Sequence, residues 1–437
     1  MKKTTILFLI LLFVAGSVFA GGGGQKGSGA AVPGEISGNL EFWGPDGAGA
    51  NPNDPQNIWW RETIAQFRAK YPKVNMQVSS TPGQANEYLM KLTTELAAGR
   101  SPDVMRTYLT GRLQPFVEAK MVRSLKPFLD ARPELKKTIN PIAISYAQFG
   151  SADFYALPTD KSGEVIWYNK KVFRDNGISV PKTYDELIAI SAALKNKGII
   201  PMTVGGKDVW PIAVPYMMLF ERMYGLDLYK SVIVGHEAKF DDPAFAEAGR
   251  KIQEMQRLGV FSPSITAVGN DEARAEFLSG KAAMWPEGVW SLTSLLAAMG
   301  DDLGFFNFPA VSGGKGGAND WLINFDGGIA ISQNTKNLPA AEAWLEFLFS
   351  PERQVDVMQK GLLVASINLP VDTSKLHPTQ NELSRALDGA ANAYIPFDNP
   401  LGAVMGNEFN SAVQRCFAGD DPVRAFQDLN RTARLEW

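Results

Sequence analysis

Strands and helices alternate along the first part of the chain, and this order constrains the fold more than any other feature. Apolar runs predict strands at 36–43, 74–78 and 103–107, and amphipathic helices at 58–70 and 87–98 lie between them. Tyr71-Pro72 and Gly99 end the two helices. Strands joined by helices of this length pair in parallel through right-handed crossovers. The sequence therefore predicts an α/β domain on a mainly parallel sheet.

A second series of the same kind follows Leu157-Pro158. It contains strands at 165–169 and 201–204, and a helix from Asp241-Asp242-Pro243 to about Leu258. Another helix begins after Thr183, which forms a capping box with Glu186. Since 437 residues exceed what one ordinary core holds, two domains are expected.

Residues 277–290 combine a helix end, a short strand and an aromatic segment. Gly280 suits a helix C-terminus, and 282–284 is predicted to be a buried strand. Pro286 and Gly288 are expected to turn the chain and to leave Trp285, Glu287 and Trp290 in a loop at the strand edge. Such loops often bind ligands. Core packing of both Trp side chains is an equally good interpretation of this segment alone.

Composition excludes several classes of function. An apolar content of 45% and a charged content of 20% are typical of a soluble globular protein. A net charge of -3, without a basic stripe, argues against a nucleic-acid partner. With two His, one Cys and no HExxH motif, no metal site and no cofactor are expected. No GxSxG, P-loop or GxGxxG motif appears, so no catalytic residues are assigned. Cys416 is expected to pack as a small hydrophobe.

The first twenty residues resemble a secretory signal peptide. Lys2-Lys3 precede an apolar run at 6–14, and Val18-Phe19-Ala20 supplies small residues for cleavage. The run is shorter than the roughly 20 residues that a membrane span needs. Gly21, not Cys, follows the cleavage point, so no lipid anchor is expected. Residues 21–35 have the composition of a flexible linker.

An ordered set of segments across almost the whole mature chain resembles one family: the substrate-binding proteins of bacterial ABC importers, in particular family 1 of the extracellular solute-binding proteins, which serves sugars. The matching segments are Leu40-Glu41-Phe42-Trp43, Tyr88-Leu89-Met90-Lys91-Leu92, Ala97-Ala98-Gly99, Pro102-Asp103-Val104, Tyr155-Ala156-Leu157-Pro158, Trp167-Tyr168-Asn169-Lys170, Pro181-Lys182-Thr183-Tyr184-Asp185-Glu186-Leu187, Gly280-Lys281-Ala282-Ala283-Met284, Gly288-Val289-Trp290, Gly327-Gly328, Ile331-Ser332 and the helix 341–348.

The resemblance implies the type II periplasmic binding protein fold: two α/β lobes, each a mainly parallel sheet flanked by helices, joined by crossover hinge strands. The expected division gives 36–157 and 308–364 to lobe 1, and 158–307 and 365–437 to lobe 2. Tyr155–Thr159 and Leu303–Pro309 are then the hinge strands. A ligand that touches both lobes would stabilise a closed state.

The resemblance also implies a function without catalysis. The protein would capture a carbohydrate, with an oligosaccharide favoured, and deliver it to the membrane subunits of an ABC permease. It would act as a monomer in the periplasm. Two alternatives stay open: a secreted glycoside-active enzyme, although no carboxylate pair can be singled out, and a sensor that reports its ligand to a membrane receptor.

A carbohydrate site needs aromatic platforms and a few polar groups that hydrogen-bond hydroxyls. The resemblance implies stacking roles for Trp290 and Trp210, and Glu287 is predicted to accept a hydroxyl hydrogen bond. The candidate ligand-binding residues are Trp43, Asp46, Arg106, Asp160, Trp210, Trp285, Glu287, Trp290, Trp321, Asp326 and Gly327. The competing interpretations are a turn for Asp46 and Gly327, a surface ion pair for Arg106 and core packing for the Trp residues.

Overall fold

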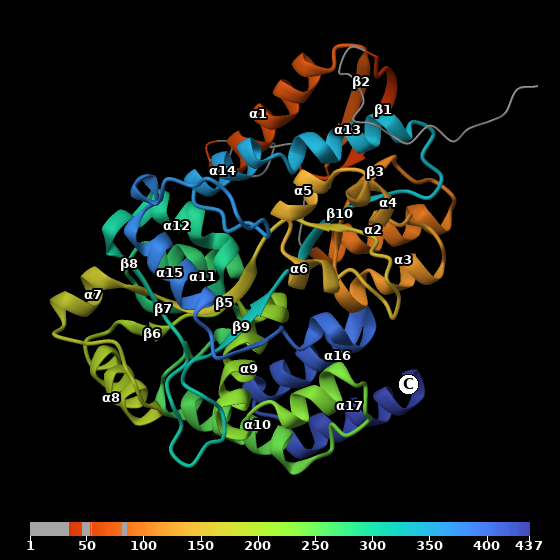
Figure 1. The fold of residues 1–437 in the computed structure, drawn as a ribbon. Helices are drawn as coiled ribbons and strands as arrows, with labels where there is room; N and C mark the ends of the chain where they lie inside the picture. The colour runs from red at the N-terminus through yellow and green to blue at the C-terminus, as the bar shows by residue number, and fades with distance from the viewer. Residues whose placement is uncertain (1–34, 46–52, 54, 81–84) are drawn as a thin grey trace, which may run out of the picture.

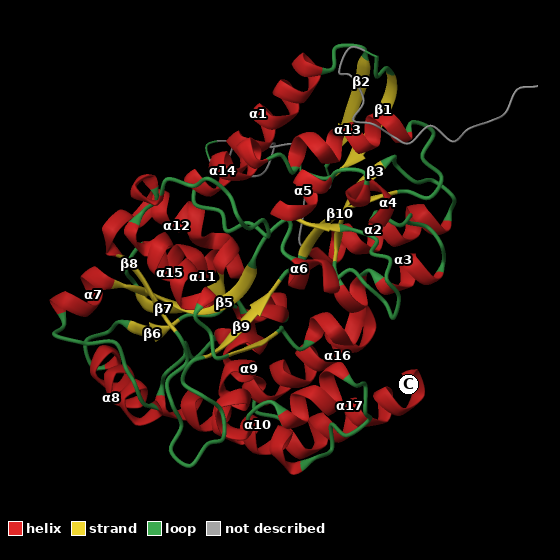
Figure 2. Cartoon of the chain, in the orientation of Figure 1, coloured by secondary structure: helices red, strands yellow, loops and turns green. Residues whose placement is uncertain are grey.

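The computed structural model describes residues 35–45, 53, 55–80 and 85–437, which form two lobes, each built on one β-sheet (Figure 1; Figure 2). The expected signal peptide at 1–20, the linker as far as residue 34, and Asp46 lie outside the described residues. Within the described part of the chain, no helix is both long and apolar enough to cross a membrane.

The sheet of the first lobe has the strand order β2-β1-β3-β10-β4. Its strands are β1 (Gly38–Trp43), β2 (Val74–Ser79), β3 (Val104–Tyr108), β4 (Leu157–Pro158) and β10 (Gly327–Ile331). β1 pairs in parallel with β2 and β3, as the alternating pattern predicts, whereas β10 runs antiparallel to β3 and β4. The antiparallel pairs arise because β10 enters the sheet from the other lobe.

Helices cover both faces of this sheet and bury its apolar side chains. They are α1 (Pro55–Lys70), α2 (Ala85–Ala97), η1 (Thr110–Arg112), α3 (Gln114–Glu118), α4 (Lys126–Asp130), α5 (Pro133–Thr138), α6 (Pro141–Ser145), α13 (Leu338–Leu348) and α14 (Pro351–Gln359). Phe42 of β1 is fully buried against Trp344 of α13, with ring centroids 5.5 Å apart. Phe67 of α1 packs edge-on against the same indole at 4.9 Å, so β1, α1 and α13 share one core.

The sheet of the second lobe has the order β11-β9-β5-β7-β6, and β8 also pairs with β5. Its strands are β5 (Ser162–Asn169), β6 (Ile200–Met202), β7 (Ala282–Gly288), β8 (Leu303–Phe306), β9 (Asp320–Asn324) and β11 (Asn392–Tyr394). β5 runs antiparallel to β7, β8 and β9, whereas β6 with β7 and β9 with β11 are parallel. The two-lobe α/β fold is confirmed, but the sheets are mixed and not mainly parallel as expected, because β10 in the first sheet and β5 in the second run antiparallel to their neighbours.

The helical elements of the second lobe include the helices predicted after Thr183 and from Asp241-Asp242-Pro243. They are α7 (Lys170–Asp175), α8 (Tyr184–Lys195), η2 (Gly206–Asp208), α9 (Trp210–Tyr224), η3 (Tyr229–Val234), α10 (Pro243–Leu258), η4 (Ile265–Ala267), α11 (Asn270–Leu278), η5 (Val289–Ser291), α12 (Leu292–Met299), η6 (Gly300–Asp302), η7 (Thr373–Lys375), α15 (Pro378–Asp388), α16 (Asp398–Ala418) and α17 (Pro422–Glu436). The capping box at the start of α8 is confirmed, since Thr183 Oγ1 accepts from Glu186 N at 3.2 Å and Glu186 Oε2 accepts from Thr183 N at 3.3 Å.

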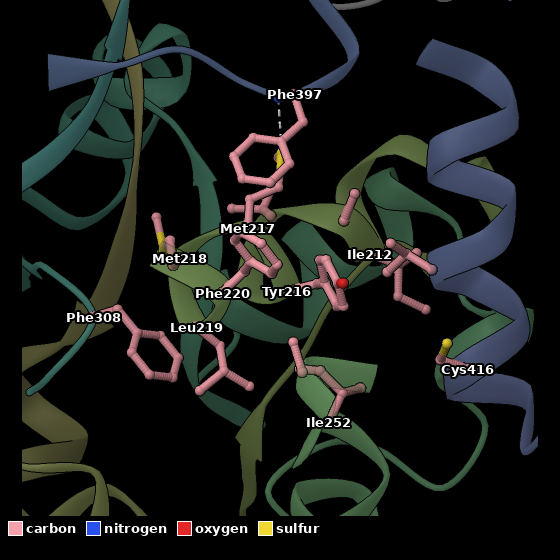
Figure 3. Close-up of a cluster of buried hydrophobic side chains, with 14 of the residues drawn as sticks. Ile212, Tyr216, Met217, Met218, Leu219, Phe220, Ile252, Phe308, Phe397 and Cys416 are labelled. Carbon is pink, nitrogen blue, oxygen red and sulfur yellow. Dashed lines mark hydrogen bonds between the residues drawn. The ribbon is translucent and has the colours of Figure 1, made fainter. Parts of the chain in front are cut away.

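Helix α9 lies at the centre of the second lobe and is buried over most of its length (Figure 3). Phe397 N–H donates to the Met217 sulfur at 3.1 Å, and the Tyr216 hydroxyl donates to the Phe245 carbonyl at 2.9 Å. Cys416 of α16 packs in the same core, as expected, and burial raises the pKa of its thiol to about 12.

Residues 303–324 do not follow the division into lobes that was expected from the sequence. Leu303–Phe306 is not a hinge strand, because β8 pairs with β5 inside the second sheet. Residues 308–324, assigned to lobe 1 from the sequence, instead place β9 beside β5 and β11. The chain passes between the sheets from β4 to β5, from β9 to β10, and again after α14 (Figure 1).

The expected turn at Pro286 and Gly288 is also wrong, because β7 continues to Gly288 and pairs with β5 along that stretch. Proline fits there since β6 pairs with β7 only at Ala282 and Met284, which leaves that edge of β7 without a strand partner at Pro286.

The burial of α9 predicts a large loss of stability on truncation. Phe220→Ala removes a fully buried ring that stacks on Phe245 at 4.8 Å, and it should lower the free energy of unfolding by about 3–5 kcal/mol. Val404→Ala, at a side chain 59% exposed in the same lobe, should change it by less than about 0.5 kcal/mol. Equal effects of the two substitutions in urea unfolding would contradict this packing.

Candidate ligand-binding site

A cavity of about 300 Å³ lies between the two lobes, at the place where the chain crosses from one sheet to the other. Its lining residues are Arg106, Tyr108, Arg112, Asp160, Ser162, Asp208, Trp210, Trp290, Asp326, Gly327 and Asp398. The first lobe contributes β3 and η1, and the second contributes η2, α9, η5 and α16. The two crossings supply Asp160, Ser162, Asp326 and Gly327. The volume falls at the lower end of the range for small-molecule sites.

Two indoles form an aromatic wall of this cavity. The ring centroids of Trp210 and Trp290 lie 5.7 Å apart with an interplanar angle of 57°. Trp290 is 37% exposed, which is unusual for so large a side chain. Its six-membered ring lies directly over Gly288, where an added Cβ would sit 2.2 Å from Cη2, Cζ2 and Cζ3. The glycine thus leaves the space in which the ring lies, and the wall offers apolar faces to a ligand.

The first lobe contributes two arginines to the lining. Arg106 Nη1 donates to the Tyr108 hydroxyl at 3.1 Å, and the guanidinium lies 4.8 Å from that ring. The two side chains share one face of β3 because they are two residues apart. Arg112, in η1, also approaches the Tyr108 ring, at 5.4 Å. Both guanidiniums are therefore placed by the same tyrosine.

Arg112 connects the first lobe to helix α16 of the second. Its Nη2 donates to Asp398 Oδ2 at 3.0 Å, and its Nη1 lies 3.9 Å from Asp326 Oδ1. Asn399 Nδ2 donates to Asp326 Oδ1 at 3.1 Å, and Asn410 Nδ2 donates to Asp398 at 3.1 Å. Burial raises the pKa of the Asp326 carboxyl to about 6, even though Arg112 opposes that shift.

Asp160 and Gly327 lie against each other where the two crossings meet. Thr159 Oγ1 donates to Asp160 Oδ1 at 2.6 Å, and Thr159 N donates to the Gly327 carbonyl at 3.0 Å. A Cβ at position 327 would lie 2.3 Å from Asp160 Oδ1, so a larger residue would displace the carboxylate. Burial raises the pKa of Asp160, with Arg106 acting in the opposite direction.

Two further carboxyls lie behind the cavity wall on adjacent strands. Glu164 of β5 stands opposite Gly288 of β7, next to Glu287. Burial, together with the neighbouring carboxyls of Asp398 and Glu287, raises the pKa of Glu164 well above its usual range. Glu287 Oε2 accepts from Asn270 Nδ2 at 3.1 Å, and burial raises the pKa of Glu287 to about 7.

A second cavity, of about 450 Å³, adjoins the first and shares Arg106, Asp160 and Trp290 with it. Its other walls include Trp59 and Trp60 at the start of α1, whose ring centroids are 4.9 Å apart at 75°. The space between the lobes therefore extends beyond the volume next to Trp210, and a ligand in the first cavity has room to continue toward α1.

The structure brings most of the predicted residues together. Arg106, Asp160, Trp210, Trp290, Asp326 and Gly327 line the first cavity, and Glu287 lies just behind it.

The other candidates lie elsewhere. Trp285 is 1% exposed and packs against Phe277 in the core, at 5.9 Å. Trp321 is buried near Phe305, and its Nε1 donates to Asn319 at 2.9 Å. Trp43 lines neither cavity, and Lys91 Nζ lies 5.5 Å from its ring. Asp46 lies outside the described residues.

Sequence reasoning missed Tyr108, Arg112, Ser162, Asp208 and Asp398 as lining residues. Tyr108 had a usable signal, since it follows Arg106 by two residues on the same strand and so shares its face. Asp398 lies in the Pro396–Pro400 break of a helical pattern, which is a local irregularity of the kind that functional residues often occupy. Nothing in the local sequence connects either residue to Arg112.

Residues 50–355 match the family described as bacterial extracellular solute-binding protein. The chain belongs to this family. An ABC transporter extracellular-binding protein of Pyrococcus horikoshii is 27% identical over 342 residues, 76% of this chain and 73% of the relative. The diacetylchitobiose binding protein of Streptomyces coelicolor is 26% identical over 393 residues, 85% of this chain and 82% of the relative.

Solved structures share the fold. One, from work on xylan utilization by the thermophilic bacterium Caldanaerobius polysaccharolyticus, is 27% identical with a TM-score of 0.82, over 90% of this chain and 99% of that one. A chitin oligosaccharide binding protein has a TM-score of 0.81 at 22% identity, over 91% of this chain and 98% of that one. The two-lobe fold is therefore shared with these structures.

The contact between Gly288 and Trp290 predicts that Gly288→Ala displaces the indole, because the added methyl would overlap its ring. The indole N–H resonance of Trp290, assigned from its loss in Trp290→Phe, should shift in Gly288→Ala. Gly269→Ala is the control, since its Cβ would have its nearest neighbour at 3.7 Å. An unchanged Trp290 resonance in Gly288→Ala would contradict the packing.

The pKa of Glu287 predicts a specific dependence of stability on pH. Between its ordinary pKa near 4.5 and its folded pKa of about 7, the folded protein holds a proton that the unfolded chain has lost. Stability should therefore fall as pH rises through that window. Glu287→Gln removes this contribution. Between about pH 5 and about pH 8, the free energy of unfolding of wild type should therefore fall by on the order of 1–3 kcal/mol more than that of Glu287→Gln. Parallel pH profiles of the two proteins would show that Glu287 titrates normally.

Proposed function

We propose that this protein is the substrate-binding component of an ABC transporter, and that it captures a carbohydrate between its lobes and delivers it to membrane subunits. The observation that carries the proposal is the Trp210–Trp290 wall, which faces a cavity lined by Arg106, Asp160 and Asp326. Indole faces pack against the C–H faces of a sugar, while arginine donors and carboxylate acceptors bind its hydroxyls. The names of the diacetylchitobiose and chitin oligosaccharide binding relatives support the same ligand class.

An oligosaccharide fits the site better than a single sugar. The cavities of about 300 and 450 Å³ adjoin at Arg106, Asp160 and Trp290, so a chain of sugar units can occupy both. In the second cavity, Trp59 and Trp60 provide further aromatic surface.

Ligand capture would act through the relative position of the lobes. We propose that one lobe comprises 36–157 with 325–364, and the other 158–324 with 378–437. A sugar that contacts Arg106 on one lobe and Trp290 on the other makes both contacts only in the closed arrangement of the lobes. It therefore stabilises that arrangement by the free energy of the contacts that the open arrangement lacks. The permease would recognise this closed state.

The protein would act without catalysis, as an exported monomer in the periplasm after removal of residues 1–20. The sensor alternative uses the same binding step, and only the membrane partner distinguishes it.

A glycoside-active enzyme would release shorter sugars, because paired carboxyls at suitable separation cleave the glycosidic bond. Incubation with an oligosaccharide panel, with melting temperature and product formation measured together, separates binding from hydrolysis. Steady release of products would overturn the proposal.

The two Trp residues at either end of the 285–290 segment should differ in their roles. Trp290→Ala should weaken carbohydrate binding at least about tenfold and leave the melting temperature of the unliganded protein nearly unchanged, because the ring is partly exposed. Trp285→Ala is the matched variant. It should lower the free energy of unfolding by about 3–5 kcal/mol, since its ring lies in the core. Intact ligand binding in Trp290→Ala would exclude the aromatic wall as the site.

A further inference from the structure

We propose that the first cavity selects saccharides that carry a positively charged amine over neutral ones of the same length, and that it rejects anionic saccharides. The inference rests on the proposed carbohydrate binding and specifies the chemical class of the ligand. It follows from the charges that line the cavity, from how the arginines are already paired, and from buried oxygens that no protein group satisfies.

The lining contains more acid than base. Asp160, Asp208, Asp326 and Asp398 face two arginines, and the lining residues that the structure describes include no lysine or histidine. Glu164 and Glu287 lie behind the wall, but burial raises the pKa of both, so they add little charge near pH 6 and the balance is that of the lining residues. A cavity with this balance has a negative potential, and low-dielectric walls strengthen that potential.

Both arginines are already engaged by protein groups. Arg112 donates to Asp398 at 3.0 Å and lies 3.9 Å from Asp326. Arg106 donates to the Tyr108 hydroxyl and interacts electrostatically with Asp160 and Asp326. A carboxylate or phosphate on a ligand would compete with these partners and would add to the excess of negative charge. The guanidiniums therefore balance the acids that surround them and leave no surplus for an anion.

Asp208 is the acid best placed to meet a cation. Its Oδ2 accepts from the backbone N–H of Asn270 at 2.6 Å, and no ion pair joins it to a cation within the described part of the chain. It lies two residues before Trp210, so it borders the aromatic wall. An ammonium group next to that wall has both a carboxylate and an aromatic face within reach, and both attract cations.

Buried oxygens without partners give an independent indication of a ligand with several donors. Ser162, 1% exposed, lines the cavity, and its Oγ has no hydrogen-bond partner among the described residues. Glu164, 3% exposed and two residues further along β5, has an unpartnered Oε2. Buried polar atoms are rarely left in this state, and each example calls for an explanation. Of the two residues only Ser162 lines the cavity, and an ammonium, with three donors and no acceptor, suits its oxygen together with the carboxylates of the lining.

A cation also interacts with the buried carboxyls, but it lies outside the lining of the cavity. Arg274 interacts with Glu287 and lowers its pKa, but less strongly than burial raises it. Arg274 is not among the lining residues. The described surface that meets the ligand thus keeps four carboxyls against two guanidiniums.

The test uses two tetrasaccharides with the same backbone, the neutral, fully N-acetylated and the charged, fully deacetylated glucosamine tetramers, with neutral cellotetraose to control for the acetyl groups and tetragalacturonate as the anion. Calorimetry of the full mature chain at about pH 6 keeps the amines protonated. We expect the amine form to bind at least about tenfold more tightly than the N-acetylated form, and tetragalacturonate to show no measurable binding. Added salt should weaken binding of the amine form far more than that of the neutral form.

Variants localise the effect. Asp208→Asn keeps the acceptor for Asn270 but removes the charge, and it should reduce the preference for the amine form several-fold while binding of the N-acetylated form persists. Asp271→Asn is the control, since it removes one charge from the exposed surface of α11 beside the site. It should leave the preference unchanged.

The outcomes separate this inference from the proposed function. Equal affinities for the amine and N-acetylated forms, or tighter binding of tetragalacturonate, would overturn the charge selection and leave carbohydrate binding in place. An undiminished preference in Asp208→Asn would overturn the role given to that carboxylate. Failure to bind any sugar, including neutral xylo-oligosaccharides and raffinose, would overturn the proposed function itself.

Discussion

The double crossing between the two sheets is the constraint on which the rest of the structure depends. β4 leads into β5 and β9 leads into β10, and the two crossings are held side by side because β10 pairs with β4 on one side and β9 with β5 on the other. Glycine makes this closeness possible: a Cβ at Gly163 would lie 2.5 Å from the Leu322 carbonyl, and one at Gly327 would meet Asp160. The polar groups at the base of the cavity are therefore fixed by backbone pairing, and their positions follow from the fold.

The sequence predicted the order of the elements far better than the direction in which individual side chains point. Alternating patterns located β1, α1, β2, α2 and β3, and the ordered set of motifs indicated the two-lobe family. They did not distinguish Trp285 from Trp290. Whether a strand residue meets core or cavity depends on which face of the sheet is covered, and here α11 and α12 cover the face that holds Trp285. The assumed turn at Pro286 hid that alternation, because it treated strand residues as a loop.

The other shortfall concerned contacts between distant parts of the chain. Leu303–Phe306 has the apolar pattern of a buried strand, but this pattern does not say which sheet the strand joins, and it was assigned to the hinge. In the same way, Arg112 and Asp398 form one ion pair although 286 positions separate them. Such a pair exists only after α16 has packed against η1, so a single sequence contains no local signal for it.

The cavity combines features that cost stability with a fold large enough to tolerate them. Glu164 and Ser162 keep unpartnered oxygens in buried positions, and several carboxyls are buried close together. Unsatisfied buried groups of this kind usually cost folding free energy, typically about 1–3 kcal/mol each. The extensive aromatic core around α9 offsets such losses in the second lobe (Figure 3). Ser162 lines the cavity, so a hydroxyl or ammonium donor that enters there can become a partner for its oxygen, and this gain favours binding; Glu164 lies behind the wall. A site organised in this way favours ligands by the donors that they bring, and it disfavours those that bring further negative charge.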